Sequence, residues 1–386
     1  MSSFGLWIVG AGGHVGAFTL AGWHALRAGL LPPTGLVTTA PPFETLPLGA
    51  LEDAVFGGHE LPGRSLAEAI ERLVAERILG REVAEAAAVR DGVAAAQREL
   101  REGVVDHGGW DDVQRVRTDL DGFRARTGVT RVIVLNVAST EADVADAASL
   151  PRDPDAFVAA LRAGARLPAS AVYALAALDL GMGYVNFTPS TGSDLPALHA
   201  LALARGAVHA GADGKTGQTL LKTVLAPMFA IRRLRVTSWV SHNILGNEDG
   251  RALHDPGRRA SKQRSKRAPL AAILGYEPES HVGIDYVPSY GDWKLAWDRI
   301  VFAGFGGAEM TLELTWRGSD TALAAPLCID LVRLVELAQR RGERGVLAYL
   351  ALFFKSPLGA SEHRLDRQWQ ALVRHLLPEL PASEVP

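Results

Sequence analysis

The chain has 386 residues, of which 48% are hydrophobic and 22% are charged, and its formal net charge is -3. This size allows two or three domains, or one domain with a large insertion, and the nearly balanced charge argues against nucleic acid or a membrane surface as a partner. The single cysteine, Cys328, excludes an internal disulfide framework and favours a reducing, cytoplasmic location. No run approaches the roughly 18 apolar residues of a membrane span, and the first residues predict a strand rather than a signal peptide.

The N-terminal pattern predicts a dinucleotide site. An apolar run at residues 6–9 is followed by the glycine turn GAGGHVG at 10–16 and by a helical pattern at 17–28. This order brings a pyrophosphate to a helix N-terminus, because small residues let the backbone approach the phosphates. An ordinary glycine-rich turn is the alternative, since the spacing is GxGxxxG rather than GxGxxG. The predicted cofactor residues of the turn are Gly10, Gly12, Gly13, His14 and Val15.

Further alternation of strands and helices predicts a doubly wound α/β domain. Strand patterns occur at 53–60, 130–135, 183–187 and 207–210, and helical patterns lie between them. Glu60 ends the second strand, where a carboxylate accepts hydrogen bonds from a ribose and disfavours a 2'-phosphate, so we expect NAD rather than NADP. A surface glutamate is the alternative. The ends of the later strands add the candidate cofactor residues Asn136, Ser139 and Thr188.

The stretch GADGKTGQTL at 211–220 precedes a helix predicted at 220–231. Thr216 and Thr219 are suitable N-caps, and the free amides of a first helical turn attract an anion. The lysine precedes the glycine pattern instead of ending it, so the stretch is not a Walker loop. A phosphate site is predicted here, with a plain capped helix as the alternative.

From residue 232 the pattern changes to alternating strands, at 234–241, 280–287, 298–305 and 308–316, which predict an antiparallel or mixed sheet. Helices are predicted at 326–340, 345–354 and 365–377. We therefore expect three parts: a Rossmann NAD-binding domain at 1–220, an α+β catalytic and oligomerisation domain with a mixed open sheet at 221–333, and C-terminal helices at 334–386 that pack back on the centre.

Lysine is scarce, with six among 40 basic residues. Unlike arginine, a lysine can lose its proton when it is buried or crowded by like charge. Lys262, Lys266, Lys294 and Lys355 follow the phosphate-like stretch, and together they indicate acid–base chemistry on a phosphorylated substrate. Each of them alone would more simply be a solvated surface cation.

These motifs together resemble the myo-inositol-1-phosphate synthase family, in the form shared by archaea and eukaryotes. The glycine turn resembles the family's GLGGNNG, and the other stretches resemble GDDxKSGQTK at 211–220, SYNHLGNNDG at 241–250 and RSKEISKS at 260–267. The resemblance continues at 286–294, 326–331 and 354–358, and so covers nearly the whole chain. The departures are His14 and Val15 for two asparagines, Ala212 for an aspartate, Leu220 for a lysine and Glu248 for an asparagine.

The resemblance implies NAD-dependent conversion of glucose 6-phosphate to an inositol phosphate without net redox change. Carbon 5 is oxidised, an enolate forms at carbon 6 and attacks the carbon 1 aldehyde, and the hydride returns. The implied catalytic residues are Lys262 for the carbon 5 proton transfer, with Lys355 as its partner at the oxygen. Lys266 and Lys294 would hold the phosphate or stabilise the enolate and the aldol oxygen, and Asp213 and Asp330 would organise ammonium groups. The implied phosphate ligands are Thr216, Gly217, Gln218, Thr219 and Asn243. Asp213 and Asp249 would also contact the cofactor, Asp249 or Asp330 could hold a divalent or monovalent cation, and the assembly would be a homotetramer.

Three alternatives stay open at this point. The same chemistry on fructose 6-phosphate would close a five-membered cyclitol ring for specialised metabolism, and the departures at Ala212, His14 and Val15 suggest it. A non-catalytic NAD-binding relative would be expected to lack the lysines. A net oxidoreductase would accumulate NADH, whereas a cyclase would not.

Overall fold

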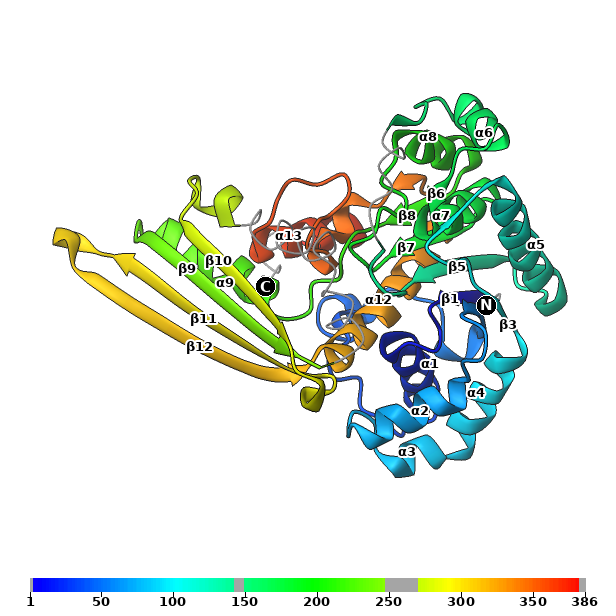
Figure 1. Ribbon diagram of the computed structural model, residues 1–386, viewed down its shortest axis with the longest axis horizontal. Helices are drawn as coiled ribbons and strands as arrows, with labels where there is room; N and C mark the ends of the chain where they lie inside the picture. The colour runs from blue at the N-terminus through cyan, green and yellow to red at the C-terminus, as the bar shows by residue number, and fades with distance from the viewer. Residues whose placement is uncertain (1–2, 142–148, 247–269, 382–386) are drawn as a thin grey trace.

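The computed structural model describes residues 3–141, 149–246 and 270–381. Its larger part is built on a parallel sheet of seven strands in the order β13-β8-β7-β5-β1-β2-β3. The strands are β1 (Phe4–Val9), β2 (Ala54–Glu60), β3 (Leu100–Glu102), β5 (Arg131–Asn136), β7 (Gly183–Asn186), β8 (Val208–Ala210) and β13 (Gly345–Val346). This is the predicted doubly wound α/β architecture (Figure 1).

Alternate residues of the central strands enter two separate cores, one on each face of the sheet. In β1, Leu6 and Ile8 belong to one core, and Trp7 and Val9 belong to the other. Both faces are buried because helices cover both, as a parallel sheet requires. The first core contains side chains of α1 (His14–Arg27), α2 (Leu66–Ala75), α3 (Arg81–Glu85), α4 (Ala87–Arg98), α12 (Asp320–Arg340) and α13 (Leu365–Leu376). The second contains side chains of α5 (Trp110–Thr127), α6 (Pro154–Arg162), α7 (Ala169–Asp179) and α8 (Pro196–Arg205).

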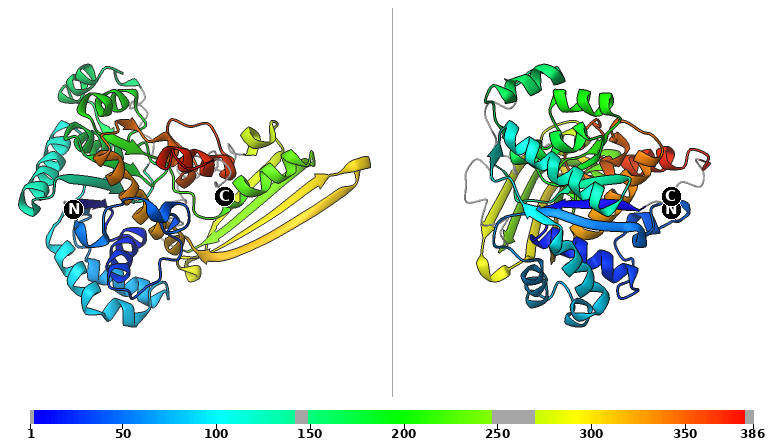
Figure 2. Two further views of the ribbon diagram at one scale, coloured as in Figure 1. Left: turned by 180° about the vertical axis from the view of Figure 1, so that it is seen from behind. Right: turned by 90° about the vertical axis from the view of Figure 1, so that its right-hand side faces the viewer.

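The second part is a mixed sheet of four long strands that projects from the parallel sheet (Figures 1 and 2). Its order is β10-β9-β11-β12, with bounds β9 (Arg235–Leu245), β10 (Glu279–Tyr286), β11 (Trp293–Ala303) and β12 (Glu309–Ser319). β9 pairs parallel with β10 and antiparallel with β11. Helix α9 (Gln218–Ile231) covers one face, where Phe229 packs with Trp239 and Ile300. A short two-stranded ribbon of β4 (His107–Gly108) and β6 (Leu167–Pro168) completes the strands among the described residues.

Two predicted helices differ from the structure. The helix expected at 345–354 is wrong, because residues 345–346 form β13 and residues 348–353 form a 3-10 turn. The helix expected from Pro326 begins six residues earlier, at Asp320, after a Ser319 N-cap whose hydroxyl accepts from the Ala322 amide. Proline favours the first turn of a helix, but Pro326 lies inside α12. As a result α12 follows directly on β12, with Asp320 as its first residue.

Within the described residues, no helix is long and apolar enough to cross a bilayer.

Candidate active site

Two adjoining pockets lie over the carboxyl ends of the parallel strands. The first extends from the glycine turn to residues 211–220, called the phosphate stretch below, and to the mixed sheet. The second extends from the glycine turn to Glu60 and Tyr173. Both are lined by Gly13 and by residues 137–140, which follow β5. Ligands of open α/β sheets bind at this edge. A dinucleotide can therefore occupy the second pocket with one end and reach the first with the other.

The glycine turn is shaped for close approach of a phosphate. Gly10 has φ +81°, and a Cβ placed on it would lie 2.8 Å from the Ala138 Cα. Helix α1 then begins at His14, with Gly13 as N-cap, no side-chain cap and no acidic residue in its first turn. The amides of that turn are thus free of a competing carboxylate from the helix itself, which suits a pyrophosphate. His14 and Val15 both line the first pocket, and the His14 ring lies 3.3 Å from the Glu76 carboxylate.

Glu60 is buried at the end of β2 beside this turn. One carboxylate oxygen accepts from the Gly12 amide at 2.5 Å and the other from the Leu61 amide at 2.8 Å. Glu60 also lines the second pocket, at the predicted ribose position. Burial raises the pKa of Glu141, in the same pocket, to about 7. The Glu60 carboxylate here disfavours an additional phosphate, so the pocket fits NAD.

The polar ends of β5 and β7 are joined into one network. Asn136 donates to Asn186 at 3.2 Å, and the Thr188 hydroxyl donates to the same oxygen at 2.7 Å. Asn136 and Ser139 line the second pocket, while Ser139 and Thr188 line the first. The three predicted residues therefore border the dinucleotide path.

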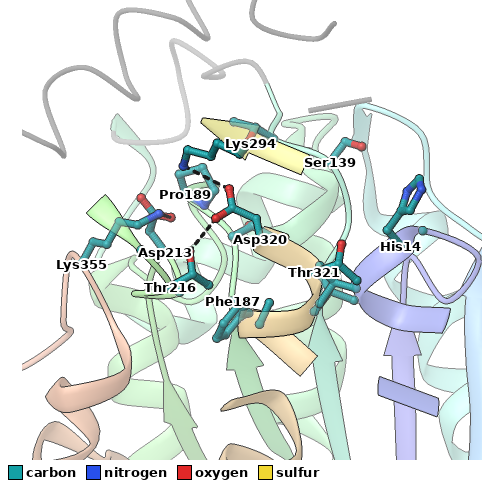
Figure 3. Close-up of a pocket in the computed structure, with 18 of the residues that line it drawn as sticks. His14, Ser139, Phe187, Pro189, Asp213, Thr216, Lys294, Asp320, Thr321 and Lys355 are labelled. Atoms are coloured by element: carbon teal, nitrogen blue, oxygen red, sulfur yellow. Dashed lines mark hydrogen bonds and ion pairs between the residues drawn. The ribbon is translucent and has the colours of Figure 1, made fainter. Parts of the chain in front are cut away.

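The phosphate stretch is held from both sides by backbone hydrogen bonds. Asp213 donates its amide to Thr188, and Lys215 donates its amide to Phe353. Asp213 has φ +63°, an unusual value for a residue other than glycine. Its carboxylate lies 2.7 Å from the Lys355 ammonium, and both side chains line the first pocket (Figure 3). The predicted pairing of Asp213 with a lysine is thus present in the geometry.

Helix α9 begins at Gln218, within this stretch and two residues before the predicted start at 220. Its N-cap is Gly217, with no side-chain cap, so the expectation that Thr216 or Thr219 caps it is wrong. Gln218 and Thr219 form the first turn of α9. Together with Thr216 and Gly217 they line the first pocket. The Thr219 hydroxyl is buried without a hydrogen-bond partner among the described residues. An anion at the helix N-terminus would find uncapped amides.

Asn243 lies behind Gln218 and does not line the pocket. Its amide donates to the Gln218 side chain at 2.8 Å, and Gln218 in turn donates to Asp298 at 2.8 Å. Its contacts therefore orient Gln218 and do not reach a bound phosphate directly.

A second lysine–carboxylate pair, which the sequence did not predict, crosses the same pocket. Lys294 from β11 lies 3.1 Å from Asp320, and the Thr216 hydroxyl donates to the other oxygen of Asp320 at 3.2 Å (Figure 3). Asp320 stands at the first position of α12. Buried Asp292 fixes that helix end, since it accepts from the Ser319 hydroxyl and from the Thr321 amide and hydroxyl. The signal that could have revealed Asp320 was the serine directly before it, a standard N-cap.

Asp330 is the predicted site residue that the structure places elsewhere. It is fully buried in α12 and does not line the first pocket. Its carboxylate accepts from the Val37 and Thr38 amides and from the Thr38 hydroxyl, and burial raises its pKa to about 6. These contacts anchor the loop after α1, so they do not support Asp330 as the organiser of a lysine, or as a cation ligand in the pocket. Asp330 sits almost three helical turns beyond Asp320, which explains why only one of them reaches the site.

Lys262, Lys266 and Asp249 lie outside the described residues. Among the residues that are described, no group of three or more His, Cys, Asp or Glu side chains could hold a metal ion.

The fold and the two pockets define an NAD-dependent enzyme of the α/β class, with paired lysines and carboxylates facing the cofactor turn. The family model for myo-inositol-1-phosphate synthase matches residues 4–376. The chain belongs to the myo-inositol-1-phosphate synthase family, and it is an NAD-dependent cyclase of the isomerase class.

Individual relatives agree with this assignment. The chain is 32% identical to "Inositol-3-phosphate synthase 1" of Bacteroides thetaiotaomicron, over 99% of this chain and 96% of the relative. A myo-inositol-1-phosphate synthase-related protein from Thermotoga maritima superposes with a TM-score of 0.77 at 26% identity, covering 97% of this chain and 98% of the other. The fold is also that of inositol-3-phosphate synthase from Caenorhabditis elegans, with a TM-score of 0.84 at 24% identity, over 97% of this chain and 85% of that one.

Proposed function

We propose that the enzyme converts glucose 6-phosphate to 1L-myo-inositol 1-phosphate. The observation that carries this proposal is the pair of lysine–carboxylate contacts, Lys355–Asp213 and Lys294–Asp320, in one pocket between the cofactor turn and the uncapped end of α9. In Figure 3 His14 lies on the opposite side of this pocket from Lys355 and Asp213.

The residues fit the three demands of the reaction. NAD held along the two pockets would supply reversible hydride transfer at carbon 5. Lys355, whose ammonium Asp213 holds at the edge of the pocket, would take part in the proton transfer at the carbon 5 hydroxyl as the partner of Lys262. Lys294 supplies a positive charge for the enolate oxygen, and Asp320 orients it. Thr216, Gly217 and Thr219 border the end where an anchored phosphate would keep the open-chain sugar curled. The assigned roles of Lys262 and Lys266 rest on the family resemblance alone.

The test follows product and cofactor together. The enzyme is incubated with NAD and glucose 6-phosphate, the products are identified by phosphorus NMR, and absorbance of NADH is recorded. We expect an inositol phosphate and no steady accumulation of NADH. Accumulating NADH with a linear oxidised product would instead establish a net oxidoreductase.

Fructose 6-phosphate is a second candidate substrate, and one observation favours it. Two of the positions that depart from the family motif, His14 and Val15, line the pocket itself. The same oxidation and enolate formation would then attack the carbon 2 ketone and give a five-membered cyclitol phosphate. Parallel incubations with each sugar phosphate decide between the two, and turnover of glucose 6-phosphate alone would exclude the five-membered ring.

We further propose a cytoplasmic homotetramer that associates through the mixed sheet. The face of this sheet opposite α9 carries the half-buried apolar residues Val240, Ile244, Leu295, Trp297 and Val301. A partner subunit would cover them. Elution at the monomer mass in gel filtration would refute the assembly. Whether a cation is required can be measured by assaying the enzyme after chelation and readdition of single salts.

A further inference from the structure

The lysine of the phosphate stretch itself, Lys215, has no part in the proposed chemistry. Its side chain is 3% exposed, and it does not line the substrate pocket. It lines instead an apolar groove on the other side of the stretch, bordered by α9, the start of α12 and α13. Its neighbour Thr216 lines both the groove and the substrate pocket, so the phosphate stretch separates the two cavities at this point.

The Lys215 side chain connects the phosphate stretch to the C-terminal helix. Its Nζ donates to the side-chain oxygen Oε1 of Gln368 on α13 at 2.5 Å. Gln368 is itself buried, and its amide donates to the Glu362 carbonyl oxygen at 2.6 Å. The contact therefore joins two segments that are 153 residues apart in the chain.

The segment between these anchors contains Lys355. The Lys215 amide donates to the Phe353 carbonyl oxygen at 2.8 Å, and the Lys355 amide donates to the Asp213 carbonyl oxygen at 2.7 Å. The backbone ladder thus places Lys355 beside Asp213, and their side chains meet in the pocket at 2.7 Å. Lys215 is two residues from one member of that pair and bonds to the segment that carries the other.

We propose that Lys215 is a positioning residue, which through Gln368 holds α13 and residues 353–355 against the phosphate stretch and so fixes the Lys355–Asp213 pair in the pocket. This inference rests on the proposed function, in which that pair takes part in the proton transfer at carbon 5. A lysine that bound the substrate phosphate directly would have to line the substrate pocket, and Lys215 does not.

The electrostatics agree with a structural contact to a neutral partner. Burial lowers the pKa of Lys215 to about 7. An amine close to neutrality can donate to an uncharged amide without the cost of a fully desolvated, unpaired ammonium.

The test compares Lys215→Met with a matched control, Arg341→Met. Arg341 also holds α13, but at its far end, where it donates to the Leu376 carbonyl oxygen at 3.3 Å. We expect Lys215→Met to lower kcat about tenfold or more while the KM for glucose 6-phosphate changes less than about twofold, because misplacement of a reacting group affects the chemical step. Arg341→Met should leave kcat within about twofold.

A double-mutant comparison separates positioning from general stabilisation. If Lys215 acts through Lys355, then Lys215→Met should lower the residual kcat of Lys355→Met by less than about twofold, because coupled residues are not additive. Gln368→Leu and Gln368→Met should both reproduce the kcat loss of Lys215→Met, because each removes the oxygen that accepts from the Lys215 amine. The Gln368 variants also decide the question if Lys215→Met fails to fold.

Hydrogen exchange provides a readout that does not depend on the substrate. Peptides covering residues 353–358 should exchange faster in Lys215→Met than in the unaltered enzyme, and not in Arg341→Met. The proposal is overturned by a raised KM with unchanged kcat, by an equal kcat loss in Arg341→Met, by an undiminished loss in the Lys355→Met background, or by unchanged exchange of 353–358. If the unaltered enzyme does not cyclise glucose 6-phosphate, the proposed function fails, and the exchange experiment still decides the positioning role.

Discussion

Replacing Asp320 by asparagine tests the lysine–carboxylate pair that the structure adds to the site. In the unaltered chain one Asp320 oxygen accepts from the Thr216 hydroxyl at 3.2 Å, and the other lies 3.1 Å from the Lys294 ammonium. Asp320→Asn keeps an oxygen that can accept from Thr216 but removes the negative charge that faces Lys294. The side chain of Lys294 is 14% exposed and that of Asp320 is 33% exposed, so water screens this pair only in part. The substitution therefore removes one charged partner with little change in shape.

A hydrogen bond to a charged group contributes about 1.5–3 kcal/mol. Partial exposure of Asp320 favours the lower end of that range, and about 1.5–2 kcal/mol corresponds to roughly a twelvefold to thirtyfold change in rate. If Asp320 orients Lys294 toward the developing enolate oxygen, the loss falls mainly on kcat. If Lys294 instead binds ground-state phosphate, the loss falls on the KM for the sugar phosphate.

The assay measures initial rates of product formation from glucose 6-phosphate at saturating NAD. The control is Glu313→Gln on the same hairpin, because the Arg299–Glu313 pair is 51% and 54% exposed and lies at 3.6 Å, outside the pocket. We expect that control to stay within about twofold. An Asp320→Asn enzyme with the same kcat and KM as the unaltered enzyme would refute the role assigned to this carboxylate.

Three further substitutions follow from buried contacts. Glu60→Ala removes the acceptor of the Gly12 amide. We expect the Kd for NAD, measured by calorimetry, to rise about tenfold and the discrimination against NADP to weaken. An unchanged Kd for NAD would contradict this. Burial lowers the pKa of His24 to about 4, so the unfolded chain binds more protons than the folded one, and stability is lost as pH falls from about 6.5 toward 4. Compared with His24→Leu, the unaltered enzyme should lose about 2 kcal/mol of unfolding free energy between pH 7 and pH 5, measured by urea titration. Parallel pH profiles of the two proteins would contradict this. A Cβ on Gly214 would lie 2.1 Å from the Phe187 ring, so Gly214→Ala should destabilise by about 1–3 kcal/mol, whereas Gly22→Ala, with no atom within 4 Å, should not lower the melting temperature.

The parallel sheet and the cofactor edge were predictable because local signals there agree with the tertiary structure. Residues 6–9 are apolar on both faces of the strand, and this pattern fits only a strand covered on both sides. The glycine turn follows at once, and the strand and turn predicted from it are the observed ones. Strand boundaries in the mixed sheet differ from the prediction mainly because β11 begins at Trp293, in a stretch whose tryptophans and charges hide the alternation.

The carboxylates of the candidate site were harder to predict, because sequence spacing alone does not say which end of a helix reaches the site. Asp330 lies in an apolar run that resembles a family motif, and it is buried by the loop at Val37 and Thr38. Asp320 lies before that run, where Pro326 suggested that no helix had yet begun. Only the packing of α12 against the parallel sheet, with Asp292 fixing its first turn, brings Asp320 to Lys294.

The positions of the four described departures from the family motif change the question about substrate. Ala212 pairs through its backbone with Ser356 and does not line the pocket, and Leu220 lines the apolar groove on the other side of the phosphate stretch. Only His14 and Val15 border the substrate pocket, and they do so from the cofactor side. Among these four positions, those that could alter the choice of sugar therefore lie at the cofactor turn and not at the phosphate end. Restoring asparagine at 14 and 15 is for this reason a sharper test of substrate choice than restoring aspartate at 212.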